Sequence, residues 1–323
     1  MLEGGINMTT KQQISKAVIA LGAAVLLSSC GNEGTTSDGK VQETAIRGSA
    51  VILVDEEIAG LLEPAKKLYD KAHPDAKVTF QHVSSRDAVH NLLDGSARGI
   101  VLARNFVEDE TQAVTAANRK PFPQSILAKD AIVFYAAKSF PYDTMSSEHI
   151  VMWFRGDLKS DSFRSQYPNL NTAPTFVVPG VNSSVTANVV NIVLNGKSPA
   201  RGSLTSLEGR DSVKTYVLRT KNAIGVGLLS QFVRDTSVKL LQLSYRDSAG
   251  VYQSPKPVHQ AYVAMKKYPF IVPIVMMLRD PVGQYNLPGG VLQYLARTGD
   301  VQRTFLDAGI VPGYARIELT LPE

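Results

Sequence analysis

The stretch KVTFQHVSSRDAVHNLLDG, residues 77–95, indicates which class of fold this chain adopts. Residues 77–83 alternate between apolar and polar side chains, which predicts a half-buried β-strand. From Ser84 onward the apolar residues follow helical spacing, and Asp87 stands three residues after Ser84, as in a capping box at a helix start. A strand that leads directly into a helix is the repeating unit of α/β folds.

Strands and helices also alternate on both sides of this stretch. Apolar and β-branched runs predict further strands at 50–55, 99–104, 130–137, 174–178, 223–229, 238–243 and 270–278. Helical spacing predicts helices after Asp55, over about 108–117, between the turn at 179–180 and Gly196, and on both sides of Gly299. Asp55 is the expected N-cap of the first of these helices, and Pro64 either kinks that helix or marks its start. The alternation predicts an α/β fold with mostly parallel sheets.

The length of the chain predicts two lobes. About 280 of its residues remain for folding after the N-terminal segment, which is more than one hydrophobic core usually organises. The segments SFPYD (139–143) and SPKP (254–257) have the composition of hinge or boundary segments. We predict that residues 46–132 and 262–323 form the first lobe and that residues 133–261 form the second.

The N-terminal residues predict export. Lys11 and Lys16 precede an uncharged stretch over 17–27 that ends in small residues, which is typical of a secretory signal peptide over 1–29. This apolar run of about 11 residues is half the ~20 that a transmembrane helix needs, so it does not predict a membrane span. Met8 is an alternative start to Met1, because the residues before it add nothing to the signal.

The only cysteine, Cys30, predicts how the exported chain is held. Leu27-Ser28-Ser29-Cys30 resembles the lipobox of bacterial lipoproteins, in which the cysteine is lipidated and becomes the mature N-terminus. Two or more acyl chains anchor a protein stably to a membrane where one does so marginally. Residues 30–45 have no apolar side chain before Val41 and are predicted to be a flexible linker. The alternative is an ordinary free cysteine near a cleavage site.

The composition and the motifs argue against an enzyme. Hydrophobic residues make up 44% and charged residues 20% of the chain, which are ordinary values for a soluble globular protein. The net charge of +5 mildly favours an anionic partner, or is simply a solvated basic surface. The sequence contains no GxSxG, HExxH, P-loop or complete GxGxxG motif, and its five histidines lack the spacing of metal ligands. We therefore predict no catalysis, no metal, no cofactor and no nucleic-acid partner.

Hydroxyl-rich turns are the candidate ligand sites. The turns Gly48-Ser49, Ser84-Ser85-Arg86 and 182–186 each adjoin a predicted strand. Free N–H groups and the helix dipole make helix starts natural anion sites, although serine also caps helices for purely structural reasons. Ligands of open α/β sheets sit at the carboxyl ends of the strands. We therefore predict that the turns at Ser84 and Ser184 face each other across a cleft and share one site.

Six segments in succession resemble the PstS-like family of phosphate-binding periplasmic proteins. They read HVSSRDAVHNLLDGSARGIVLARNF, AKDAIVFYAAKSFP, SSEHIVMWFRGDL, PGVNSSVTANVV, AIGVGLL and KKYPFIVPIVMML. Ile150, Phe154 and Gly156 match the family pattern LT-x-x-Q-(I/L)-x-x-I-(F/Y)-x-G. The resemblance implies a class II periplasmic-binding-protein fold with two lobes and a hinge, which closes on a small anion and delivers it to an ABC transporter permease.

The resemblance also implies a set of ligand residues. These are Ser49, Ser84, Ser85, Arg104, Ser183, Ser184 and Thr186. Val185 stands where the family has the glycine of its SGT element, and Gly180 stands where the family has an arginine. Arg104 replaces an aspartate of long members, and a donating arginine suits phosphate, sulfate or a carboxylate alike. The alternative for Arg104 is a surface salt bridge at a strand end.

The sequence thus predicts an exported, lipid-anchored solute-binding protein in the periplasm or at the cell surface. Its predicted partners are phosphate or another small oxyanion, an ABC transporter permease and the membrane that holds the anchor. A different class of function stays open: a lipoprotein that keeps this fold as a structural or protein-interaction module and binds no solute. An enzyme acting on a phosphorylated substrate is a third alternative.

Overall fold

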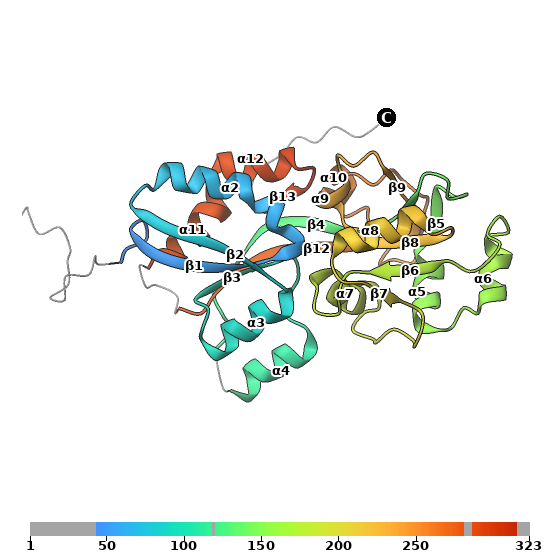
Figure 1. The fold of residues 1–323 in the computed structure, drawn as a ribbon, viewed down its shortest axis with the longest axis horizontal. Coiled ribbons are helices and arrows are strands. Elements are labelled where there is room, and N and C mark those ends of the chain that lie inside the picture. Colours follow the sequence, from blue (N-terminus) through green and yellow to red (C-terminus); the bar gives the residue numbers. More distant parts are fainter. Residues whose placement is uncertain (1–42, 118–119, 281–285, 315–323) are drawn as a thin grey trace, which may run out of the picture. The chain divides into compact units, whose positions relative to one another are not determined.

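A computed structural model of the chain describes residues 43–117, 120–280 and 286–314. The predicted signal peptide, Cys30 and most of the predicted linker lie outside the described residues. The residues from Thr44 onward belong to one compact unit, which is drawn in Figure 1. Within the described ranges, every helix is too short or too polar to cross a bilayer.

Lobe 1 is built on five strands in the order β2-β1-β3-β12-β4. Their bounds are β1 (Gly48–Asp55), β2 (Ala76–Val83), β3 (Gly99–Leu102), β12 (Ile271–Leu278) and β4 (Gln124–Ala137). The strands β1, β2 and β3 are parallel, and Val54 of β1 pairs with both His82 and Val101. The carboxyl ends of these three strands therefore meet at one edge of the sheet.

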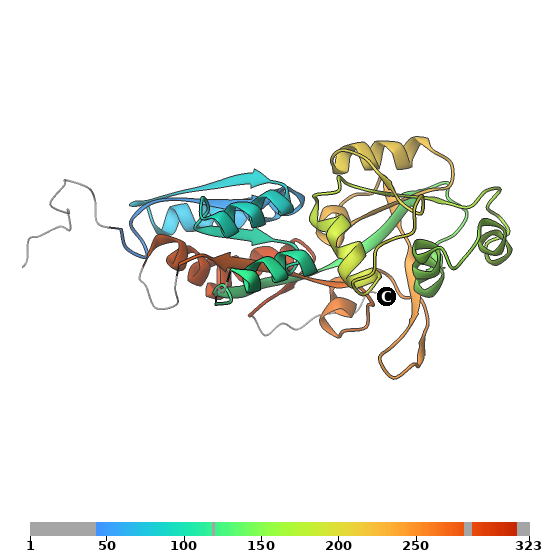
Figure 2. The same cartoon turned by 90° about the horizontal axis from the view of Figure 1, so that it is seen from below.

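Strand β4 joins the lobes. Its residues from Gln124 to Ala131 pair with β12, whereas Ile132 to Ala136 pair with β8 of lobe 2. Figure 2 shows this strand, in green, running from one lobe into the other. The remaining strands are β5 (Thr144–Ser146), β6 (Thr175–Val178), β7 (Thr205–Ser206), β8 (Ala223–Leu228), β9 (Val238–Leu240), β10 (Gln242–Arg246), β11 (Tyr252–Gln253) and β13 (Val311–Pro312). In lobe 2, β8, β6 and β7 are parallel neighbours.

Helices cover both faces of the lobe 1 sheet (Figure 1). The helices of lobe 1 are η1 (Glu56–Ile58), α2 (Ala59–Ala72), α3 (Ser85–Asp94), α4 (Glu108–Ala116), α11 (Leu287–Arg297) and α12 (Gly299–Asp307). Ile52 and Val54 point into the main core with α2 and α11, while Leu53 packs with Val89 and Leu92 of α3. Because side chains alternate along β1, successive residues of this strand pack against helices on opposite faces of the sheet.

The remaining helices surround the second sheet. They are α5 (Ser147–Arg155), α6 (Ser160–Gln166), α7 (Ser184–Asn188), the π-helical turn η2 (Val189–Val193), α8 (Arg210–Arg219), α9 (Leu229–Phe232) and α10 (Gln260–Ala264). Phe134 of β4 packs against Phe154 and Phe176 in the core of this lobe. The predicted two-lobed α/β fold is confirmed.

Three local predictions need correction or refinement. Helix α2 begins at Ala59, so Pro64 lies inside it and does not mark its start. Strand β4 begins at Gln124, six residues before its predicted start at residue 130, because Lys129 interrupts the apolar pattern just before that start. The predicted strand over 238–243 is divided between β9 and β10.

Candidate functional site

The two predicted turns meet at the interface between the lobes. The Ser85 hydroxyl of α3 donates a hydrogen bond to the Asn182 carbonyl at 3.0 Å, although 97 residues separate them. The backbone N–H of Arg86 donates to the same carbonyl at 3.2 Å. The turns near Ser84 and Ser184 are thus neighbours, as predicted, but they contact each other directly; the cleft and the shared ligand site stay predictions.

The start of α3 is organised by its two serines. The Ser84 hydroxyl accepts a hydrogen bond from the Asp87 N–H at 3.2 Å and donates to the Asp87 carboxylate at 2.7 Å. This is the predicted N-cap. The Ser85 side chain is fully buried. Arg104 fixes its orientation, because the Ser85 oxygen accepts a 2.9 Å hydrogen bond from Arg104 Nε. Ser85 is therefore the hydroxyl of this turn that points across the interface.

Arg104 is a buried structural residue. Its guanidinium is 1% exposed and forms a bidentate ion pair with Glu110 at 2.6 and 2.8 Å. The remaining N–H groups donate to Ser85 Oγ, to the Ser85 carbonyl and to the Asn105 carbonyl. An arginine has five N–H donors, and all five are thus occupied by protein atoms. The expected role of Arg104 as a direct anion ligand does not fit this arrangement, and the pair is not at the surface either.

On the lobe 2 side, most hydroxyls are used locally. Ser183 caps α7 by accepting from the Thr186 N–H at 3.2 Å, and the Thr186 hydroxyl donates to the Pro179 carbonyl at 2.8 Å. Ser184 differs, since its hydroxyl is fully buried and has no hydrogen-bond partner among the described residues. Asn188 reaches across the interface, where its amide donates to the Ala103 carbonyl at 2.7 Å.

Asp55 is the site residue that the sequence reasoning missed. Its carboxylate is fully buried at the carboxyl end of β1 and accepts hydrogen bonds from the Glu57 N–H and the Ala103 N–H, both at 3.1 Å. Burial raises the pKa of Asp55, and the nearby Ser184 hydroxyl and the two N–H groups only partly offset that effect. The sequence identified Asp55 as a helix cap alone. Its place directly after a strand, at the edge where ligands bind, was the available signal.

Two further buried carboxyls lie along the interface. The Gln231 amide donates to the Glu57 carboxylate at 2.7 Å and to the Glu57 carbonyl at 3.0 Å, which links α9 to η1. Burial, with a contribution from the charge of Asp55, raises the pKa of Glu57 to about 7. Asp130 of β4 accepts from the Ser230 N–H at 3.2 Å, and burial raises its pKa to about 6.

Ser49 does not join this cluster. It lies exposed at the start of β1, whereas the site residues lie at the other end of the strand. The expectation placed it in a turn that adjoins a strand, but Ser49 lies inside β1, which begins at Gly48 and ends at Asp55. The turn that follows β1 in this chain is therefore the acidic run Asp55-Glu56-Glu57.

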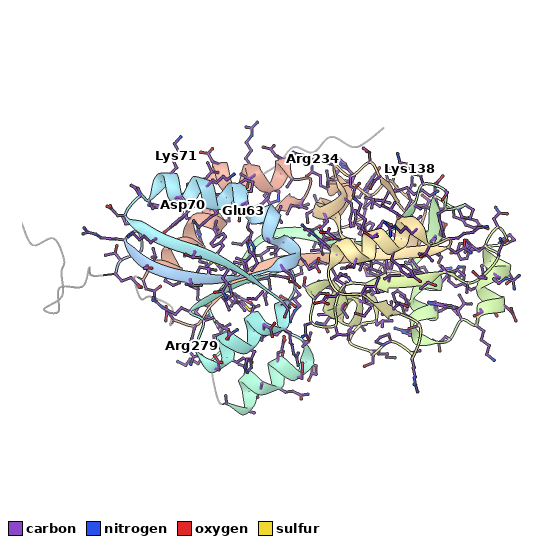
Figure 3. All side chains as sticks on the ribbon, in the orientation of Figure 1. Glu63, Asp70, Lys71, Lys138, Arg234 and Arg279 are labelled. Atoms are coloured by element: carbon purple, nitrogen blue, oxygen red, sulfur yellow. The ribbon has the colours of Figure 1, made fainter. Side chains whose placement is uncertain are left out.

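A groove of about 530 Å³ lies beside Glu57, between α2 and α12 of lobe 1 and α8 and α9 of lobe 2. Lys214 and Asp235 form an ion pair at 2.5 Å in its wall. Arg234, labelled in Figure 3, donates to the Asp307 carbonyl at 3.0 Å. Side chains of both signs line this groove, and Arg210 forms a further ion pair with Asp211 at 3.8 Å. No group of three or more potential metal ligands is assembled within the described ranges.

Comparisons with known proteins agree with the fold. A family model described as "PBP superfamily domain" matches residues 39–298. A putative phosphate ABC transporter substrate-binding protein with bound phosphate from Clostridium perfringens is 16% identical with a TM-score of 0.66, over 82% of this chain and 99% of that chain. An ABC-type phosphate transport receptor from Vibrio cholerae is 15% identical with a TM-score of 0.60, over 82% and 100%.

OxyR from Corynebacterium glutamicum is 11% identical with a TM-score of 0.53, over 94% of this chain and 76% of that chain. No curated protein matches the sequence. Identities this low establish a shared architecture, and function rests on the site itself. The predicted resemblance to PstS-like binding proteins is confirmed, and with most of its length matched by the family model the chain belongs to the PBP superfamily.

Proposed function

We propose that this protein is the solute-binding component of an ABC importer and that phosphate or a related oxyanion binds between its lobes. One observation carries the proposal: buried hydrogen-bonding groups from both lobes converge where β1 and β3 end. Ser85 and the Arg86 N–H approach from α3. The Ser184 hydroxyl, which forms no hydrogen bond within the described part of the chain, approaches from lobe 2. Ligands of open α/β sheets bind at this edge.

A solute reaches this place when the lobes separate. Hinge motion about a connecting strand such as β4 is the usual route in two-lobed proteins. Separation breaks the contacts of Ser85 and Arg86 with Asn182, which frees their donors for an anion. Of the predicted ligand residues, Ser85 and Ser184 are those we assign to direct contact. Ser84, Ser183 and Thr186 fix the turns, and Arg104 positions Ser85. The proposal assigns binding and no catalysis.

Binding is tested by calorimetry and thermal shift with phosphate, sulfate, molybdate and small carboxylates. A ligand at 100 times its Kd adds about 2.7 kcal/mol of stability, which a melting curve resolves. Ser85→Ala and Ser184→Ala should each weaken binding by about tenfold, because a hydrogen bond to a charged group contributes about 1.5–3 kcal/mol. Ser49→Ala is the matched control and should bind like the parent. Absence of any signal up to millimolar oxyanion contradicts the proposal.

We further propose that the protein is exported and held at the membrane by lipidation of Cys30. The proposal is supported by the lipobox-like order of residues 27–30 and by the polar segment that follows it. A Cys30→Ala protein should leave the membrane fraction, while the parent protein stays with it. A variant that remains membrane-bound after a salt wash argues against the anchor.

A second candidate function is a binding module that takes no solute. It is favoured by the buried Asp55 carboxylate, which occupies N–H donors that an oxyanion would use. A module of this kind gives no calorimetric signal with any oxyanion.

A further inference from the structure

The lobes contact each other directly, through hydrogen bonds between the chain's own groups. Ser85 and the Arg86 N–H donate to Asn182, Asn188 donates to the Ala103 carbonyl, and Gln231 donates to Glu57. These bonds lie at the carboxyl ends of β2, β1 and β3, so they flank Asp55, which ends β1, on both sides. The two lobes are therefore in direct contact along this edge of the sheet.

Asp55 stands at the centre of this interface and is hydrogen-bonded as a bound anion would be. Each carboxylate oxygen accepts one backbone N–H, from Glu57 at the start of η1 and from Ala103 at the end of β3. Both of these N–H groups belong to lobe 1. From lobe 2, the Ser184 hydroxyl lowers the pKa of Asp55, although burial raises that pKa overall. The groups that surround the carboxylate are those that would surround an oxyanion at this edge.

The local charge also disfavours a second anion. Asp55, Glu57 and Glu110 are all buried here. Among the described residues the buried cation is Arg104, whose five donors are already used. Arg86 contributes a second positive charge, but it is divided between Glu110 and Asp109. A fully ionised oxyanion placed beside Asp55 would meet like charge in a buried setting, where screening by water is weak.

We propose that Asp55 supplies the anion of its own interlobe site, so that the lobes close on the Asp55 carboxylate and a free oxyanion binds only by displacing it. This inference rests on the proposed function only for the position of the solute. Asp55 is thereby a specificity-determining residue. To displace it, a solute must bind the site more favourably than the Asp55 carboxylate does with its negative charge and its two N–H bonds.

The first test measures phosphate binding by calorimetry. Asp55→Ser removes the carboxylate, shortens the side chain and frees the Glu57 and Ala103 N–H groups. It should bind phosphate at least tenfold more tightly than the parent protein. Asp94→Asn is the matched control: it removes one exposed carboxylate from the far end of α3 in the same lobe and should bind like the parent. Equal phosphate affinity of Asp55→Ser and the parent overturns the inference.

The second test follows lobe closure without relying on a ligand. In the full chain with Cys30→Ser, spin labels on Lys71→Cys of lobe 1 and Lys138→Cys of lobe 2 report the distance between the lobes. Both lysines are exposed and are labelled in Figure 3. The parent distance should be the same with and without phosphate. The Asp55→Ser distance should be longer or more broadly distributed without phosphate and should return to the parent value when phosphate is added.

The outcomes separate the two proposals. If Asp55→Ser keeps the parent distance without phosphate, Asp55 does not hold the lobes and the inference is wrong. If the distance lengthens but phosphate leaves it unchanged, Asp55 holds the lobes as inferred and the proposed oxyanion ligand is wrong. Circular dichroism checks folding, and Asp55→Asn, which keeps the size of the side chain, is measured in the same way if Asp55→Ser does not fold.

Discussion

Arg104→Ala separates a structural role for this arginine from a ligand-binding role. In the folded protein the guanidinium makes two short contacts to Glu110, at 2.6 and 2.8 Å, and both side chains are almost fully buried. Truncation leaves the Glu110 carboxylate buried without its main counterion. A residue that served only as a ligand contact would instead leave the empty protein as stable as before.

The loss of stability follows from that burial. Removing one partner of a buried ion pair costs about 3–5 kcal/mol, because an uncompensated charge stays behind. Glu110 keeps a 3.0 Å contact to Arg86 and a 3.0 Å hydrogen bond from the Val107 N–H, so the lower end of that range applies. We expect Arg104→Ala to lose about 3 kcal/mol, which for a protein of this size lowers the melting temperature by roughly 6 °C.

Urea unfolding followed by circular dichroism measures this loss. Arg86→Ala is the matched control, since Arg86 also binds Glu110 but is 44% exposed, and an exposed pair contributes about 0–1 kcal/mol. The double variant Arg104→Met with Glu110→Leu removes both charges and should lose less than Arg104→Ala alone. The reasoning is refuted if Arg104→Ala unfolds within about 0.5 kcal/mol of the parent, or if Arg86→Ala costs as much.

Three further predictions concern the same unit. Burial raises the pKa of Glu57 from 4.5 to about 7, so the free energy of unfolding of the parent protein should fall as pH rises from about 4.5 to 7. In urea titrations Glu57→Gln should flatten this slope and should be more stable than the parent by up to about 3 kcal/mol at pH 8. Ser184→Ala should leave the melting temperature nearly unchanged, because the buried hydroxyl forms no hydrogen bond among the described residues and acts only on the pKa of the neighbouring Asp55; a clear loss contradicts this expectation. Gly290→Ala should destabilise by about 1–3 kcal/mol, since a Cβ there overlaps the Ala45 carbonyl, whereas Gly299→Ala, which faces open space, serves as control.

Local patterns in the sequence predicted the fold well. The alternation over 77–83 and the Ser84 cap appear in the structure because both depend on residues only a few positions apart. The two-lobed arrangement followed from chain length and from the order of strands and helices. Strand β4 was shortened in the prediction because Lys129 breaks its apolar run. The buried Asp130, at the predicted start, accepts hydrogen bonds from the N–H groups of Ala131 and Ser230.

The site was harder to predict because its decisive contacts are distant in sequence. The Ala103 N–H that binds Asp55 is 48 residues away. The local sequence therefore predicted Asp55 as a helix cap but not its hydrogen bond from Ala103. Arg104 looked available for a ligand because its partner Glu110 sits in the next helix, where an acidic first turn is ordinary. The hydroxyl turns were predicted correctly as neighbours, but a hydroxyl pattern cannot show which donors are already used within the protein.

Competition between Asp55 and a free oxyanion is decided by entropy and by the number of hydrogen bonds. A carboxylate that belongs to the chain loses no translational freedom on entering the site, whereas a free anion loses several kcal/mol of it, about 4 or more at a 1 M standard state. A free anion must therefore form bonds that Asp55 does not. Asp55 accepts two backbone N–H groups, and the buried Ser184 hydroxyl beside it has no partner among the described residues. A tetrahedral oxyanion has further oxygens, which can accept hydrogen bonds from Ser184. They can also accept from the Arg86 N–H once the lobes separate and Asn182 no longer binds it. The Ser184 hydroxyl is thus the donor through which a solute gains most over the internal carboxylate, and losing it should cost the solute more than it costs the empty protein.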